Sequence, residues 1–310
     1  MFIHQYPGWT NFRFNQHSVL KELCELRFLQ GKLLGELRFA MPDVSAEIHL
    51  ADLGALLGPE VAKKALFEQV KGAAEDFNAE VSEATLLALH AKFVQGGGQF
   101  RTSDPREGEA GFYAVKAERI EAELSKFFRW FKEPGVDSVL AAAVAHLWFE
   151  TIRPFASGNG ALGRLLADLL ISRGEGAFGR YFGLWQEVYS AREAYYASLL
   201  AAEEGNGDIT AWLLWFFGAF KRALEAAGEK FSGEISSARL TLKLSKLALT
   251  ARQKRLVETL RALGEISNEA WAAETGISHD SALRDFASLR EVGLVEKTSG
   301  GRSTKYRLKE

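Results

Sequence analysis

Apolar residues recur at three- and four-residue spacing along most of the first 230 residues, with polar residues between them. This spacing places the apolar side chains on one face of a helix. One of these segments contains the run TAWLLWFFGAF, whose aromatic density predicts a helix that is buried on most sides. The predicted helices cover residues 19–37, 59–77, 82–94, 116–132, 190–203 and 209–227. The pattern therefore predicts a mainly α protein.

Two stretches interrupt this pattern. Residues 96–111, GGGQFRTSDPREGEAG, are polar and rich in glycine, which predicts a surface loop between helices. Residues 228–248 lose aromatic content and gain Ser and Lys, which indicates a connecting helix or linker into a separate module. We therefore expect a domain boundary near Ala248.

From Leu249 onward the pattern predicts three helices and then two strand-like runs around Ser299-Gly300-Gly301. This order resembles a winged helix-turn-helix, in which Ser278 would cap the recognition helix. Residues 281–309 carry seven basic and three acidic residues, and such a patch suits DNA, with Ser281, Ala282 and Arg284 facing the bases. The DNA-contacting candidates are Ser278, Ser281, Arg284, Arg302, Ser303, Lys305 and Arg307. The alternative is a dimerisation or protein-packing module.

Charge, apolar run length and cysteine content indicate the expected location and partners of the protein. The formal net charge is -2, so an affinity for nucleic acid would have to come from this local patch. The longest apolar run, residues 212–220, is about half of a membrane span, and the first residues lack the pattern of a secretory signal. The single cysteine, Cys24, lies in a leucine-rich stretch, which predicts a buried structural thiol. We expect a cytoplasmic protein with no membrane partner.

The segment HLWFETIRPFASGNGALGRLLADLL carries the clearest candidate chemistry. Pro154 and Phe155 break a helical run, and Gly158-Asn159-Gly160 permit positive φ and close backbone approach. Arg164 follows inside the next helix. This arrangement is typical of a loop that binds phosphate groups.

The loop resembles the signature of the Fic family, His-Pro-Phe-x-(Asp/Glu)-Gly-Asn-(Gly/Lys)-Arg-x-x-Arg, which implies a Fic-type helical core and transfer of AMP from ATP to a protein hydroxyl. Arg153 stands where the family has its general base, and an arginine cannot accept a proton. Ser157 replaces the acidic residue that holds the divalent cation, and Ala161 replaces the first arginine. The remaining signature positions match at Pro154, Phe155, Gly158, Asn159, Gly160 and Arg164. We therefore expect no catalytic residue and no metal site.

Other features of the family are also altered. Phe100-Arg101 resemble the start of the flap that docks the target protein, but the β-prone flap sequence is missing. The inhibitory motif Ser-x-x-x-Glu-Gly has its nearest counterpart in VSAEIHLADL, where Ser45 is followed by Glu47 two residues later rather than four. No inhibitory residue is carried over.

Several assignments within the loop stay open. Arg153 either binds an anion or pairs with a carboxylate such as Glu150, and Arg164 either binds phosphate or forms an ion pair. Asn159 either shapes the turn or contacts a ligand, whereas His146 is expected to be a core histidine. The candidates for binding a nucleotide or another small anionic effector are Arg153, Ser157, Gly158, Asn159, Gly160 and Arg164.

These features predict an N-terminal helical domain (1–95), a degenerate Fic core (96–227), a linker (228–248) and a winged helix-turn-helix (249–310). The leading hypothesis is a pseudoenzyme that needs no cofactor and regulates transcription by binding DNA, in the form of a homodimer through its N-terminal helices. The first alternative is a protein AMP-transferase, or a related nucleotidyl or phosphoryl transferase, that uses ATP and Mg²⁺ with non-standard residues. The second is a protein-binding scaffold.

Overall fold

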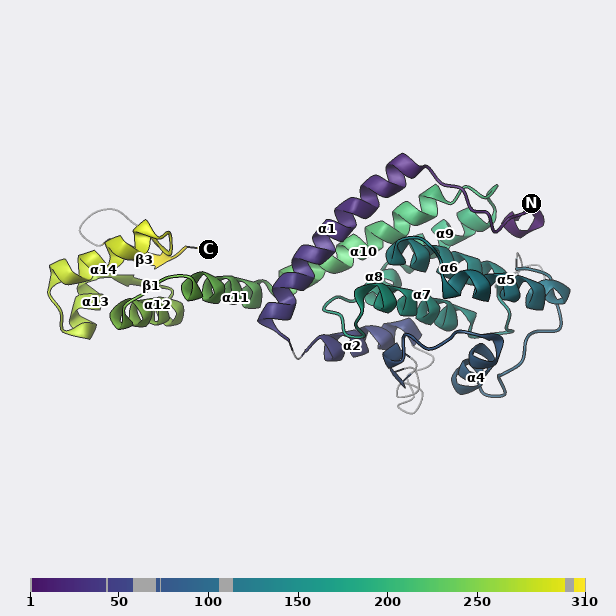
Figure 1. Ribbon diagram of the computed structural model, residues 1–310, viewed down its shortest axis with the longest axis horizontal. Helices are drawn as coiled ribbons and strands as arrows, with labels where there is room; N and C mark the ends of the chain where they lie inside the picture. Colours follow the sequence, from purple (N-terminus) through teal and green to yellow (C-terminus); the bar gives the residue numbers. More distant parts are fainter. Residues whose placement is uncertain are drawn as a thin grey trace. The chain divides into compact units, whose positions relative to one another are not determined.

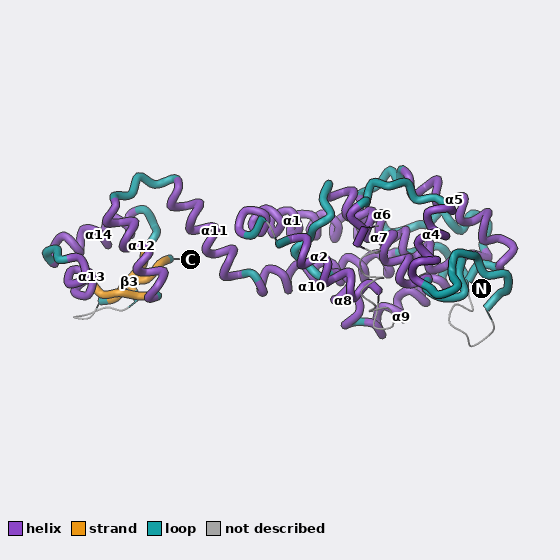
Figure 2. Tube along the Cα trace, turned by 90° about the horizontal axis from the view of Figure 1, so that it is seen from below, coloured by secondary structure: helices purple, strands orange, loops and turns teal. Residues whose placement is uncertain are grey.

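The computed structural model describes residues 2–42, 44–57, 71–72, 74–105, 114–298 and 304–309. The chain divides into two compact units, Met1–Ser232 and Gly233–Glu310. Figure 1 labels their elements along the chain, and Figure 2 shows that the described strands belong to the second unit. The predicted mainly α fold is confirmed.

Helix α1 (Gln16–Ala40) begins the first unit and packs lengthwise against α10 (Thr210–Lys230), as Figure 1 shows. Asn15 caps α1 by accepting a hydrogen bond from the Ser18 backbone N–H at 3.0 Å. Buried positions of α10 include Trp212, Phe216 and Phe220. This burial confirms that the aromatic run packs in a core. Because α1 lies against α10, the first 95 residues and the predicted Fic core share one unit instead of forming two domains.

The centre of the first unit is the antiparallel pair α6 (Ser138–Ile152) and α7 (Asn159–Glu175), whose residues are mostly buried. Asp137 caps α6 by accepting a hydrogen bond from the Val139 N–H at 2.8 Å. The predicted helix over residues 59–77 lies largely outside the described residues. The surrounding elements are η1 (Ile3–Gln5), α2 (Ser45–Leu57), α4 (Glu83–Phe93), η3 (Ala117–Arg119), α5 (Ile120–Lys132), α8 (Leu184–Ser190) and α9 (Arg192–Glu203).

A fully buried polar cluster joins α7 to α2 and α8. Asp168 accepts hydrogen bonds from Arg180 Nη1 at 2.6 Å and Trp185 Nε1 at 3.0 Å, and its other oxygen lies 3.2 Å from His49 Nε2. Burial alone would raise the pKa of Asp168, but the charge of Arg180 and these hydrogen bonds outweigh it and hold the pKa below its ordinary value. Burial and the same arginine lower the pKa of His49. Asp168 is therefore an ionised carboxylate that depends on Arg180.

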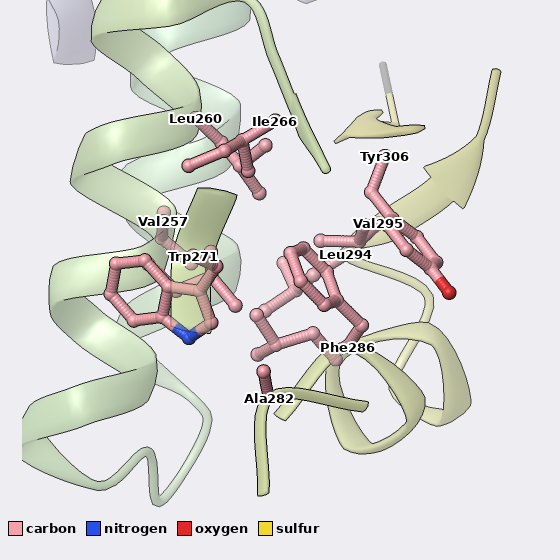
Figure 3. Close-up of a cluster of buried hydrophobic side chains, with 11 residues drawn as sticks. Val257, Leu260, Ile266, Trp271, Ala282, Phe286, Leu294, Val295 and Tyr306 are labelled. Atoms are coloured by element: carbon pink, nitrogen blue, oxygen red, sulfur yellow. The ribbon is translucent and has the colours of Figure 1, made fainter. Parts of the chain in front are cut away.

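The second unit contains helices α11 (Ser232–Ser245), α12 (Ala251–Leu263), α13 (Asn268–Thr275) and α14 (His279–Glu291), and strands β1 (Glu265–Ser267), β2 (Val295–Lys297) and β3 (Lys305–Leu308). The sheet is antiparallel with strand order β1-β3-β2, and Tyr306 pairs with Ile266 on one side and Lys297 on the other. Figure 3 shows the core, in which the rings of Phe286 and Tyr306 stack at 4.1 Å between centroids. These elements follow the order expected from the sequence, and the winged helix-turn-helix stays an interpretation.

The structure corrects the predicted boundary near Ala248. Residues 228–248 form the end of α10 and then α11, and the chain divides at Ser232 instead. Leu240, Leu244 and Leu247 pack against the core of the second unit, so α11 belongs to that unit. The predicted linker is therefore a helix with an apolar face.

The prediction of a buried thiol was wrong, because Cys24 is exposed on α1. Helical spacing gave the correct helix but did not identify which face α10 covers. The described residues of the 96–111 loop contain no helix or strand, and residues 106–113 lie outside the described part. Among the described residues, no helix has the length and apolar character needed to cross a membrane.

Candidate functional site

The loop between α6 and α7 has a tightly defined backbone. Arg153 ends α6 with φ of 43°, and within the described residues it is the only non-glycine residue with positive φ. Gly158 has φ of 79° and is the N-cap residue of α7. A Cβ at Gly158 would lie only 2.8 Å from Val94 Cγ2. Both the φ value and Val94, which directly follows α4, therefore require glycine at this position.

The side chain of Asn159 holds the turn from within. Its Oδ1 accepts a hydrogen bond from the Phe155 N–H at 3.0 Å, and its Nδ2 donates to the Phe155 carbonyl at 2.7 Å. Asn159 is buried, so these contacts satisfy both ends of its amide. Of the two roles that the sequence left open for Asn159, the contacts favour shaping the turn.

His90 holds the loop from the side of α4. Its ring stacks on Phe155 at 3.7 Å between centroids, and its Nε2 lies 3.0 Å from the Ser157 carbonyl oxygen. Its Nδ1 accepts a hydrogen bond from the Gly98 N–H at 3.0 Å. Since the carbonyl can only accept, Nε2 carries the proton and the ring is neutral. Burial lowers the pKa of His90, which favours the same state.

Arg101 holds the other half of the loop. Its Nε donates to the Arg153 carbonyl at 2.8 Å, and its backbone N–H donates to the Pro154 carbonyl at 2.9 Å. The guanidinium also donates to the Val115 carbonyl. The sequence indicated Arg101 only as part of a flap, and it gave no role to His90. Both residues therefore belong to the site as supports of the loop.

The guanidinium of Arg153 folds back over its own helix. Its Nη2 lies 2.8 Å from Glu150 Oε2, and its Nε donates to the Glu150 carbonyl at 3.1 Å. Arg153 thus forms the ion pair that was one of its two expected roles. Because a guanidinium has no accepting lone pair, a proton acceptor is lacking at the position of the family's base.

Further titratable groups lie around the paired Glu150. Burial raises the pKa of Glu203 well above its ordinary value, although the nearby charge of Arg153 partly opposes this. The guanidinium of Arg164 lies beside the start of α7, where a Cβ at Gly160 would be 3.2 Å from its Nη1. Burial therefore favours the protonated form of Glu203.

His146 does not supply a substitute base. It is fully buried, and its Nε2 lies 2.8 Å from the Tyr195 hydroxyl. Burial lowers the pKa of His146 to about 4, even though Glu150 raises it in part. A neutral histidine without access to solvent is a core residue, as the sequence predicted.

The other altered signature positions do not fit a divalent cation. Ser157 is exposed with a neutral hydroxyl, and its carbonyl oxygen is already bound by His90. A hard cation such as Mg²⁺ prefers carboxylate oxygens. Among the described residues, no cluster of three or more His, Cys, Asp or Glu side chains is suited to a metal. Ala161 is 8% exposed, so its side chain points into packed protein.

Those C-terminal candidates that the structure describes form no single basic cluster. The Ser278 hydroxyl accepts a hydrogen bond from the Ser281 N–H at 3.3 Å and lies 2.9 Å from the Ser281 hydroxyl, so both serines serve the start of α14. Lys305 pairs with Glu265 at 2.5 Å and Arg307 with Glu296 at 2.7 Å. Arg284 is exposed. Arg302 and Ser303 lie outside the described residues.

One base-facing candidate is corrected by the structure. Ala282 is fully buried in the hydrophobic core with Phe286, as Figure 3 shows. On the same helix Leu283 is 40% exposed. The exposed face of α14 therefore includes Leu283 where Ala282 was expected. Which side of a helix is buried depends on the segments that pack against it.

Comparison with known proteins agrees with the loop geometry. Residues 80–171 match the model of the Fic/DOC family, and residues 2–56 match a domain of unknown function, DUF4172. The matched Fic region contains His90, Arg101 and the whole loop. Over this region the chain therefore resembles the Fic family.

The curated relatives are named as protein adenylyltransferases. The chain is 25% identical over 205 residues to protein adenylyltransferase fic-1 of Caenorhabditis elegans, which is 64% of this chain and 37% of the relative. It is 27% identical over 146 residues to a probable protein adenylyltransferase of Aquifex aeolicus, covering 46% and 43%. The matches thus span less than half the length of these relatives.

Solved structures show the same fold. A Fic family protein from Desulfovibrio desulfuricans aligns over 94% of this chain and 96% of its own, with 21% identity and a TM-score of 0.50. Fic-1 from C. elegans aligns over 69% and 73%, with 19% identity and a TM-score of 0.50. At these identities the likeness concerns the fold alone.

Proposed function

We propose that the Fic domain binds the phosphate groups of a nucleotide such as ATP. In this proposal the protein is an adenylyltransferase that transfers AMP slowly. The observation that carries this proposal is the supported loop. Asn159, His90 and Arg101 bind the carbonyls of the loop and fix its shape. The first turn of α7 offers backbone N–H groups, and the guanidinium of Arg164 lies beside it.

The names of the curated relatives suggest ATP as the nucleotide. The slow chemistry follows from Arg153, since loss of a general base costs about two to four orders of magnitude in rate. No step is assigned to a metal ion, because Ser157 provides a poor site for one. A domain that binds ATP and rarely consumes it is suited to act as a nucleotide sensor.

Isothermal titration calorimetry of the purified full chain with ATP tests this binding. Replacing Asn159 by alanine removes both contacts with the Phe155 backbone, so we expect ATP affinity to fall about tenfold or more, which is about 1.4 kcal/mol. Ser190→Ala changes an exposed hydroxyl outside the loop and should bind like the natural chain. Circular dichroism reports whether each variant is folded.

Two results would contradict the proposal. One is a folded natural chain that binds no ATP at millimolar concentration. The other is a folded Asn159→Ala variant with the affinity of the natural chain, which would place any nucleotide elsewhere.

A second candidate function is DNA binding by the C-terminal unit, and the observation that favours it is the exposed guanidinium of Arg284 on α14. This unit carries fourteen basic and ten acidic residues, whereas the rest of the chain is acidic. A helix presented in this way suits the major groove. We infer a regulator in which nucleotide binding and DNA binding reside in the two units of one chain.

Salt-dependent binding to genomic DNA fragments separates this candidate from a protein-binding scaffold. If Arg284 contacts a phosphate, Arg284→Ala should weaken binding to all sequences and reduce the slope of log K against log salt by about one. Lys254→Ala on the exposed side of α12 should leave the slope unchanged. Affinity that is insensitive to salt would favour a scaffold instead.

A further inference from the structure

His90 lies where two segments of the chain meet, and its ring binds both of them. The residue is 4% exposed. Its Nε2 donates to the Ser157 carbonyl of the loop, and its Nδ1 accepts a hydrogen bond from the Gly98 N–H, each at 3.0 Å. A Cβ at Gly97 would lie 2.9 Å from Nδ1, so the backbone approaches the ring this closely because residue 97 is glycine. The ring therefore connects the loop to the chain around Gly98.

The chain around Gly98 reaches the loop a second time through Arg101. The Arg101 N–H donates to the Pro154 carbonyl at 2.9 Å, and its Nε donates to the Arg153 carbonyl at 2.8 Å. We call residues 98–101 the support segment. It contacts the loop directly at one end, and it contacts the histidine ring at the other. Loss of the contact with the ring would therefore free one of its two ends.

The contact between the ring and Gly98 requires a neutral imidazole. A protonated imidazole carries hydrogen on both nitrogens, so Nδ1–H would face the Gly98 N–H and neither could accept. The contact with the Ser157 carbonyl survives, because Nε2 donates in both states. The stacking on Phe155 also tolerates a positive charge. Protonation therefore breaks one specific contact, the one that fixes the support segment.

Other charged groups lie on the elements around His90, and their effects must be separated from that of the ring. Glu203, which lies near Arg153, has a pKa that burial raises well above its ordinary value. A substitution at His90 leaves all of these groups in place, so comparison with such a variant isolates the ring. The groups are Arg101 and Asp104 beside Gly98, Arg153 of the loop, Arg164 of α7, Glu83 and Lys92 of α4, Arg129 and Lys132 of α5, and Glu203 of α9.

We propose that His90 is a positioning residue whose protonation loosens the support segment and thereby weakens nucleotide binding at acidic pH. This inference rests on the proposed binding of a nucleotide by the loop. Burial lowers the pKa of His90, so the folded chain keeps the neutral ring to somewhat below the ordinary value of about 6.5. Affinity for ATP is then independent of His90 above that value, and it is lost as the pH falls through the lowered pKa.

Calorimetric titration of the full chain with ATP at about pH 7.5 and about pH 5 tests this dependence. His90→Gln keeps a polar side chain that does not titrate. We expect the affinity of the natural chain to fall about threefold or more beyond the fall seen in His90→Gln. Protonation of ATP itself affects both chains alike. His17→Gln, the same change at an exposed histidine of α1, should retain the full pH effect.

A measurement without nucleotide follows the support segment itself. Nuclear magnetic resonance of the natural chain reports the titration of the His90 ring, which the spectrum of His90→Gln identifies. We expect the Gly98 amide signal to shift with the same midpoint, because the two groups share a hydrogen bond. His90→Asn places an oxygen near the position of Nδ1 and does not titrate, so the Gly98 signal of this variant should not shift in this range.

The outcomes separate this inference from the proposed function. Absence of ATP binding at pH 7.5 contradicts the proposed function, and the inference falls with it. Binding at pH 7.5 with equal losses at acidic pH in the natural chain and His90→Gln overturns the inference alone. A Gly98 amide signal that does not follow the titration of His90 overturns it as well, whether or not the variants fold.

Discussion

Replacing Arg153 by histidine together with Ser157 by aspartate should raise AMP transfer by about two to four orders of magnitude over the natural chain. Histidine supplies a group that accepts a proton at neutral pH, and it tolerates the positive φ of 43° better than most residues do. Ser157 is exposed, so aspartate can be introduced without disturbing packing and adds an oxygen ligand for Mg²⁺. Labelled ATP with Mg²⁺ and a cell lysate measures the transfer.

The matched control is Arg153→Gln with Ser157→Asp, which also removes the ion pair with Glu150 but adds no base. It should transfer no more AMP than the natural chain. Restoring the first signature arginine at Ala161 as well is not expected to help, because that side chain is buried and an arginine would have to displace neighbouring residues. Efficient labelling by the natural chain would show that another group acts as the base.

Replacing Arg180 by methionine should lower the free energy of unfolding by about 3–5 kcal/mol at pH 7. Arg180 is fully buried and donates to the Asp168 carboxylate at 2.6 Å and to the Ser172 hydroxyl at 2.6 Å. Its loss leaves Asp168 as a buried charge with weaker compensation. Urea unfolding, monitored by tryptophan fluorescence, measures this change in the free energy of unfolding. Trp185 is a suitable probe because its indole donates to the same carboxylate.

Two comparisons isolate this effect. Arg222→Met removes an ion pair with Glu187 whose arginine is 48% exposed, and it should cost at most about 1 kcal/mol. The loss caused by Arg180→Met should shrink as the pH falls, because protonation of Asp168 removes the uncompensated charge. Equal losses for the two arginines would mean that the buried cluster contributes no more than a surface pair.

Much of the fold was predictable because helices depend on local spacing. The aromatic run of α10 and the apolar positions of α1 lie in helices whose existence required only the order of residues. The candidate loop was predictable for the same reason, since Gly158 and Asn159 belong to one short motif. The boundary at Ser232 was not, because it depends on whether α11 packs with the second unit.

The exposure of individual side chains was harder to predict. Cys24 and Ala282 each lie in a helix that was correctly expected, yet one is exposed and the other is buried. The supports of the loop were also missed, because His90 binds the Ser157 carbonyl across 67 positions of sequence and Arg101 binds the Arg153 carbonyl across 52. No short motif contains such a pair.

The sequence by itself determined that this chain has a Fic-type loop without a general base, since the chemistry of Arg153 is the same in any fold. It also determined where glycine permits the turn. Only the tertiary structure decided that Arg153 turns toward Glu150 and that His90 and Arg101 hold the loop. These features depend on contacts between distant segments, and such contacts form only when the helices pack.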